Sequence, residues 1–172
     1  MTWTIIFVFI AFAIYLTYNG VAIGLFGVPN SLSETYYLYM NKNNWMKIFF
    51  PIMMMLLVAL LMPAWIEISI GSDLQFLAFL AAGGIMFTGA APAFRGNKIE
   101  SRVHSTSAIC AAIFALLWVF FVSTVWYIAF AWLAVIISLA ILTKTLKRAK
   151  IYWLETVAFL STFTSIIIYF LR

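Results

Sequence analysis

Long apolar segments, each close to the length that a helix needs to cross a lipid bilayer, follow one another along almost the whole of this 172-residue chain. A span takes about 20 apolar residues, so the chain has room for about six crossings joined by short loops. Charged residues make up only 9% of the sequence, whereas hydrophobic residues make up 66%. A soluble domain could not cover that much apolar surface with so little charge. The sequence therefore predicts an all-α integral membrane protein.

The polar interruptions predict one transmembrane domain, residues 1–172, built as a six-helix bundle of three consecutive hairpins. Helix breakers, capping residues and charges set the expected end of each span. The predicted spans cover residues 2–26, 45–70, 74–94, 103–122, 125–143 and 151–171. The first segment has no basic residue before its apolar core, so we expect a retained span and not a signal peptide.

Two of these spans are rich in small residues, which allow another helix to approach closely. Gly20 and Gly24 lie four residues apart in the first span and predict a packing face there. Simple tolerance of glycine in membrane helices is the alternative. The third span has glycine or alanine at many positions, and we expect it to lie at the centre of the bundle.

Nine of the ten Lys and Arg residues fall in the first, third and fifth loops, which six spans place on one side of the membrane. They are Lys42, Lys47, Arg95, Lys98, Arg102, Lys144, Lys147, Arg148 and Lys150. Arg172 falls on the other side, together with Glu67 and Asp73. Short loops rich in Lys and Arg stay in the cytoplasm, so we expect a multi-pass protein of the inner (cytoplasmic) membrane with both termini outside. This orientation explains the net charge of +5, and nucleic acid is not an expected partner.

Polar side chains that could carry chemistry or bind a ligand gather on the predicted cytoplasmic side. Ionisable groups at membrane depth are costly to bury and are commonly paired or functional. The catalytic candidates are His104, Glu34, Ser31, Ser33 and Glu100. The ligand-binding candidates are Tyr36, Tyr37, Arg95, Arg102 and Glu155.

Each candidate also has a structural interpretation, which residue type and position leave open. Glu34 follows the capping-box pattern at the start of a helix. Arg95 and Arg102 are orientation signals that reach the headgroups. His104 is a hydrogen-bonded interfacial residue, and Glu155 pairs with a nearby Lys or Arg.

Several chemistries do not fit the sequence. A single histidine and a single cysteine, Cys110, cannot supply the ligands of a zinc site. Glu34, Glu100 and Glu155 would have to meet around a calcium or magnesium ion, and no ligand spacing supports that. The chain has no phosphate-binding loop or dinucleotide glycine pattern. We therefore expect no metal and no cofactor.

Three short segments resemble uncharacterised small polytopic (six-helix) membrane proteins of bacteria and their phages. The segments are Ser31-Leu-Ser-Glu-Thr-Tyr-Tyr37, Phe87-Thr-Gly-Ala-Ala-Pro92 and Val103-His-Ser-Thr-Ser-Ala108. Those proteins share a serine-containing loop after the first helix and a histidine that opens the fourth. The segments are also similar to the ceramidase and progestin-receptor superfamily of membrane hydrolases, in which a serine, an aspartate and three histidines surround zinc. This chain has only the serine and one histidine of that set, so the resemblance implies neither metal chemistry nor a substrate.

Three functions stay open, and the sequence favours the first. It is a non-enzymatic bundle, either a membrane subunit or a protein that binds lipid or a small molecule, with lipid, a second copy or another membrane protein as partner. The second is a small transporter or channel whose path would be lined by the proline-containing second span and the third span, which is rich in small residues. The third is a membrane-interface lipid hydrolase or transferase with His104 as base. Its nucleophile would be Ser31 or Ser33, oriented by Glu34 or Glu100.

Overall fold

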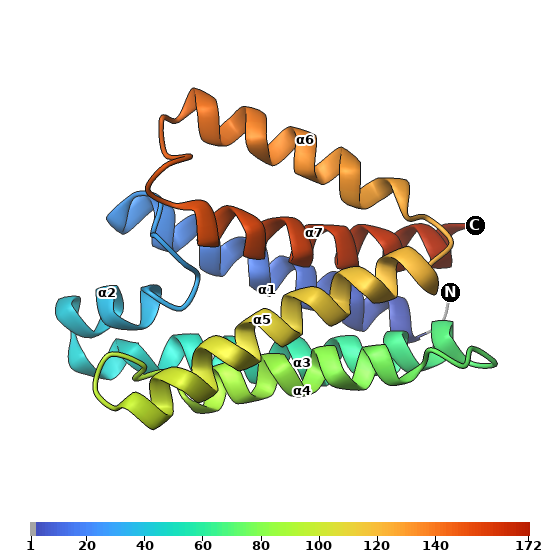
Figure 1. Cartoon of the computed structure of the whole chain (residues 1–172), viewed down its shortest axis with the longest axis horizontal. Coiled ribbons are helices and arrows are strands. Elements are labelled where there is room, and N and C mark those ends of the chain that lie inside the picture. Colours follow the sequence, from blue (N-terminus) through green and yellow to red (C-terminus); the bar gives the residue numbers. More distant parts are fainter. Residues whose placement is uncertain (1–2) are drawn as a thin grey trace.

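The computed structural model describes residues 3–172 as helices joined by short loops (Figure 1). No β-strand occurs in this range, which confirms the predicted all-α fold. The helices are α1 (Trp3–Phe26), α2 (Thr35–Lys42), the 3-10 helix η1 (Asn44–Ile48), α3 (Phe49–Ser69), α4 (Phe76–Ala90), α5 (Lys98–Phe121), α6 (Tyr127–Leu142) and α7 (Lys150–Leu171). The predicted start of the first span at Thr2 lies outside the described residues.

Four helical segments are long and apolar enough to cross a membrane: α1, η1 together with α3, α5 and α7. Helices α4 and α6 are also apolar but have only 15 and 16 residues. At 1.5 Å per residue they are about 22–24 Å long, less than the ~30 Å hydrocarbon core. Helix α4 ends at Ala90 and not at residue 94, because Pro92 disfavours helical backbone at Ala91, which has φ −114° and ψ 57°.

Helix α5 starts earlier than predicted, and a separate short helix, α2, lies between the first two predicted spans. Helix α5 begins at Lys98 and not near residue 103, because the Asn97 side chain caps it by accepting the N–H of Ile99 at 2.9 Å. Segment 35–48 forms α2 and η1, which are separated by the extended residue Asn43. Only η1 continues directly into α3.

Successive long helices run in alternate directions, so the loops gather at two ends of the bundle (Figure 1). The loops at one end are residues 27–34, 91–97 and 143–149. Together with α2, η1 and the first turns of α5 and α7 they form what is termed the basic end, because it holds every described Lys and Arg except Arg172. Arg148 Nη2 donates to the carbonyl of Val28 at 2.7 Å, and Arg95 pairs with Glu34 at 2.9 Å. Both later loops therefore contact the segment that follows α1.

Helices α3 and α7 form the centre of the bundle. Helix α3 packs against α1, α4 and α7, and α7 packs against α1, α3, α5 and α6. Buried hydrogen bonds join α5 to α3 and α7 to α1. Trp118 Nε1 donates to Ser69 Oγ at 2.8 Å, and the Tyr152 hydroxyl donates to Asn19 Oδ1 at 3.0 Å. Helix α4 packs mainly against α3 and α5, so the predicted central position of the third span is wrong.

The small residues of α4 set how closely α5 approaches it. A Cβ atom added at Gly84 would lie 2.7 Å from the backbone nitrogen of Ala111 and 2.8 Å from the carbonyl oxygen of Ser107. The two backbones therefore touch, as small residues in membrane helices allow. A Cβ atom at Gly20 or Gly24 would meet no atom of another described helix within 4 Å, so the predicted packing face on α1 contacts no other helix of this chain.

Candidate functional site

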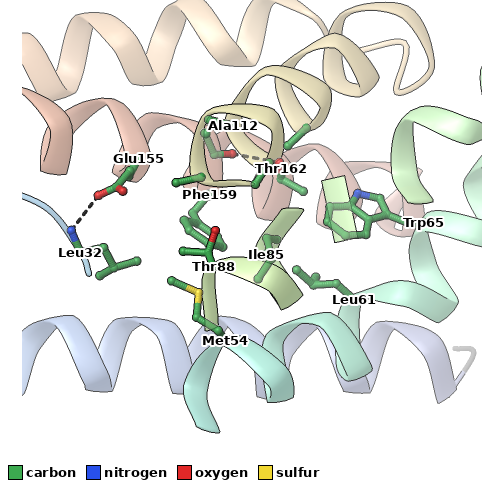
Figure 2. A pocket seen from close by; sticks show the side chains of 14 residues that line it. Leu32, Met54, Leu61, Trp65, Ile85, Thr88, Ala112, Glu155, Phe159 and Thr162 are labelled. Carbon is green, nitrogen blue, oxygen red and sulfur yellow. Dashed lines mark hydrogen bonds between the residues drawn. The ribbon is translucent and has the colours of Figure 1, made fainter. Parts of the chain in front are cut away.

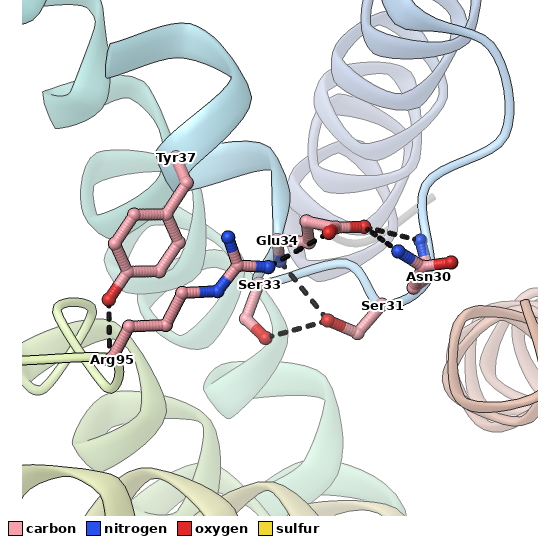
Figure 3. A network of polar contacts seen from close by, with 6 residues as sticks. All are labelled: Asn30, Ser31, Ser33, Glu34, Tyr37 and Arg95. Atoms are coloured by element: carbon pink, nitrogen blue, oxygen red, sulfur yellow. Dashed lines mark hydrogen bonds and ion pairs between the residues drawn. The ribbon is translucent and has the colours of Figure 1, made fainter. Parts of the chain in front are cut away.

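Glu34 is the centre of a polar network at the basic end, immediately before α2 (Figure 3). Its Oε2 atom accepts hydrogen bonds from the backbone and side-chain nitrogens of Asn30, both at 2.7 Å. Its Oε1 atom accepts from Arg95 Nη2 at 2.9 Å. Ser31 Oγ accepts the N–H of Glu34 at 3.1 Å, as a capping box requires, although the carboxylate reaches back to Asn30 and not to Ser31. The network joins loop 27–34 to loop 91–97.

The charged form of Glu34 is favoured by these donors. Burial raises the pKa of this carboxyl, but the hydrogen bonds from Asn30 and Arg95 outweigh that effect and leave the pKa below its ordinary value of 4.5. The Arg95 side chain is 54% exposed, so the ion pair itself contributes about 1 kcal/mol or less to stability.

Tyr37 holds loop 91–97 at a second point. Its hydroxyl oxygen accepts the backbone N–H of Arg95 at 2.7 Å, and the guanidinium carbon of Arg95 lies 4.6 Å from the centre of the Tyr37 ring. Tyr36 packs edge-on against Tyr37 with ring centres 5.1 Å apart, and burial raises the pKa of its hydroxyl. The structure thus brings three of the ligand-binding candidates together in contacts that join α2 to loop 91–97.

The remaining candidates of the basic end lie around this network. The hydroxyl oxygens of Ser31 and Ser33 are 3.1 Å apart, and Ser33 is buried. Glu100 Oε1 accepts the N–H of Ala93 at 3.1 Å and so closes loop 91–97. Arg102 lines an open depression on the outside of that loop. Among the described residues, neither Glu100 nor Arg102 forms an ion pair.

His104 is buried on α5, and its Nδ1 atom lies 2.9 Å from the carbonyl oxygen of Ala91. Because a carbonyl can only accept, Nδ1 carries the hydrogen. The imidazole stacks on Phe94 with ring centres 4.5 Å apart. Within residues 3–172 no hydrogen bond joins His104 to a serine or a carboxylate. The described part of the chain therefore does not assemble the base–nucleophile contact on which the hydrolase hypothesis depends.

Glu155 lies in the second turn of α7, and its carboxylate points toward the backbone nitrogen of Leu32 (Figure 2). Its Oε2 atom accepts the N–H of Leu32 at 2.7 Å. In the part of the chain that the structure describes, no Lys or Arg pairs with Glu155, so the expected ion pair is not formed. Arg148 of the preceding loop donates instead to the carbonyl of Val28. Glu155 thus lies beneath the loop that follows α1.

A cavity of about 40 Å³ lies between α3, α4, α5 and α7 (Figure 2). Aliphatic and aromatic side chains, together with the alanines of α5, form most of its wall. The polar groups of the wall belong to Glu155, Thr88, Thr162 and Trp65. A cavity of this size has room for on the order of three water molecules. It is a carbon-lined space with a carboxylate at one side.

The sequence singles out Glu155, whereas Trp65, Thr88 and Thr162 read as ordinary core residues of apolar helices. A helix position says nothing about which side chains from four helices will face one gap. The available signal is a run of alanines at helical spacing, which leaves room beside α5. These alanines are Ala108, Ala111, Ala112 and Ala115.

The fold and these sites define a class of protein: an all-α bundle with membrane-length helices, a polar network at its basic end and a carboxylate-bearing cavity between its helices. Comparisons with protein families, with curated proteins and with solved structures find no match to this chain. Only the geometry and chemistry of the sites themselves therefore bear on its function.

Proposed function

We propose that this chain is a non-enzymatic, multi-pass membrane protein that binds a small molecule between its helices. The observation that carries the proposal is the cavity, whose wall includes the Glu155 carboxylate with no charged partner among residues 3–172. Ionisable groups at membrane depth are commonly functional, and small-molecule sites are mostly apolar spaces with a few polar groups. At about 40 Å³, the space suits a ligand of a few atoms better than a lipid chain.

We further propose six crossings of the inner (cytoplasmic) membrane, with the basic end in the cytoplasm and both termini outside. The alternating helix directions and the gathering of basic residues at one end support this orientation (Figure 1), since short loops rich in Lys and Arg stay inside. Helices α4 and α6 are short for a crossing, and local thinning of the bilayer around them would compensate at modest cost.

The segment 27–34 separates the cavity from the basic end. Leu32 lines the cavity and bonds to Glu155, and the carbonyl of Asn30 accepts the N–H of Tyr152 at 3.0 Å. A ligand that enters from the basic end would have to displace this segment. Segment 27–34 would therefore close the cavity on the side of the basic end.

Native mass spectrometry of the protein purified in a mild detergent tests the proposal. We expect the wild type to retain a small molecule, which Ala112→Phe releases by placing a ring in the cavity (Figure 2). The matched control, Ala131→Phe on the exposed face of α6, should retain it. A wild type that retains nothing, together with an Ala112→Phe variant that unfolds at a higher temperature, would mean that the cavity is only a packing defect.

A further inference from the structure

Glu155 has more capacity to accept hydrogen bonds than the described residues use. A carboxylate offers about four acceptor positions, and the N–H of Leu32 occupies one of them at 2.7 Å. The Glu155 side chain is half-buried in the second turn of α7, close to the basic end, and it lines the cavity. A buried carboxylate without compensation is strongly disfavoured. A hydrogen-bond donor or a positive charge inside the cavity would therefore stabilise the charged form of Glu155.

The threonine hydroxyls of the cavity wall, like the Glu155 carboxylate, offer hydrogen-bond acceptors. Thr88 donates its hydroxyl hydrogen to the carbonyl of Gly84 at 2.8 Å, and the Thr162 hydroxyl donates to the carbonyl of Ala158 at 2.9 Å. A hydroxyl that has used its hydrogen in this way can only accept from a ligand. Three side chains of the wall thus present acceptors, one of them charged, which favours a ligand that is rich in donors.

Trp65 provides a hydrogen-bond donor, its indole N–H, at the other side of the cavity. Its side chain is 1% exposed, and within the described range its Nε1–H has no hydrogen-bond partner. Figure 2 shows Trp65 at the opposite side of the cavity from Glu155. One water molecule beside the ligand would satisfy this donor, and the cavity has room for it.

A metal ion fits this wall less well than an ammonium group. Calcium takes six to eight oxygen ligands and magnesium takes six, whereas no group of three or more His, Cys, Asp or Glu side chains occurs in residues 3–172 that could hold a metal. An alkylammonium ion needs acceptors for its N–H groups and apolar or aromatic contact for its carbon. Phe159 lines the cavity one helical turn after Glu155.

We propose that the cavity binds a small primary ammonium ion of a few non-hydrogen atoms, with its N–H groups donating to the carboxylate of Glu155. Its carbon would lie against Phe159 and the alanines of α5. This ligand class rests on the proposed binding function and gives that function a chemical identity.

Methylammonium is the probe that tests this inference. Isothermal titration of the protein in mild detergent, at constant ionic strength set with sodium chloride, should show saturable binding. Methanol, which is neutral and of similar size, should bind at least tenfold more weakly. Glu155→Gln keeps an acceptor for Leu32 but removes the charge, so methylammonium affinity should fall at least tenfold. Glu67→Gln, which removes a carboxylate outside the cavity wall, should change the affinity less than twofold.

Ala112→Phe is the second variant, because it leaves the carboxylate in place and occupies the space; it should abolish methylammonium binding. Folded wild type that shows no saturable binding, or Glu155→Gln that binds as well as wild type, would overturn the ammonium ligand. The proposed binding function has a separate readout. If mass spectrometry finds another molecule that Ala112→Phe releases, that function stands and only the ligand class is rejected.

Discussion

Glu34 and Glu155 both accept hydrogen bonds from the loop after α1, but their surroundings differ. Glu34 receives two N–H groups of Asn30 and one of Arg95. Among the described residues Glu155, which lines the cavity, receives only the N–H of Leu32. Charge-assisted hydrogen bonds that fill a carboxylate leave little for a ligand to add. We therefore infer a structural role for Glu34 and a binding role for Glu155.

The lowered pKa of Glu34 predicts a specific dependence of stability on pH. A carboxyl whose pKa is lower in the folded state stabilises the fold above its unfolded pKa and loses that contribution as the pH falls through the folded pKa. For Glu34 the loss should therefore begin below about pH 4.5. At pH 6–7, Glu34→Gln should lower the free energy of unfolding by about 1 kcal/mol.

Thermal unfolding in mild detergent at pH 6 and pH 3.5 measures this effect. The difference between wild type and Glu34→Gln should shrink at the lower pH, since the wild-type side chain is then becoming neutral as well. Comparison with the variant removes the contribution of the other acids. A difference of equal size at both pH values would contradict the structural role of the charge.

At the scale of single elements, the contact between α4 and α5 depends on Gly84. Because a Cβ atom there would lie 2.7 Å from backbone and not from a flexible side chain, Gly84→Ala must push the helices apart. We expect the free energy of unfolding to fall by about 1–3 kcal/mol. Gly83→Ala is the matched control, since its Cβ would meet no described atom within 4 Å. Denaturation in sodium dodecyl sulfate followed by circular dichroism measures both, and equal effects would refute the close contact.

Helices could be predicted from the sequence more reliably than their ends and neighbours. The apolar runs specify the long helices because their length and composition leave few alternatives. The start of α5 depends on one capping side chain, Asn97. Several neighbouring residues of this loop are also polar, so the sequence does not single out Asn97 as the cap. Which glycines contact another helix could not be predicted, for a different reason. Gly84 and Gly20 are chemically the same, and only the position of the neighbouring helix decides that Gly84 is in contact.

At the scale of the whole molecule, the candidate polar groups separate into a network that joins loops and a cavity between helices. The sequence predicts that they gather at one end, since the charges mark the loops. It does not predict the cavity, because the gap arises where alanines of α5 face α3, α4 and α7. Packing of four helices decides whether such small side chains leave space or are filled by neighbours. Glu155 could therefore be named from the sequence, but not its unpaired state.

The number of crossings is testable through the two loops that contact segment 27–34. Arg95 pairs with Glu34, and Arg148 donates to Val28, so this fold requires both loops on one face of the membrane. If α4 and α6 did not cross, loops 91–97 and 143–149 would lie on opposite faces.

Labelling with a membrane-impermeant maleimide in a Cys110→Ser background distinguishes these arrangements. We expect Gly96→Cys and Lys147→Cys to react only from the cytoplasmic face and Arg172→Cys only from outside. Gly96 is a suitable position because an added Cβ atom makes only ordinary contact, at 3.6 Å from the Ala93 carbonyl, and so should not disturb the loop. Reaction of residues 96 and 147 from opposite faces would exclude six crossings. It would also contradict the contacts of segment 27–34, because this segment could not then bond to both loops across a bilayer about 30 Å thick.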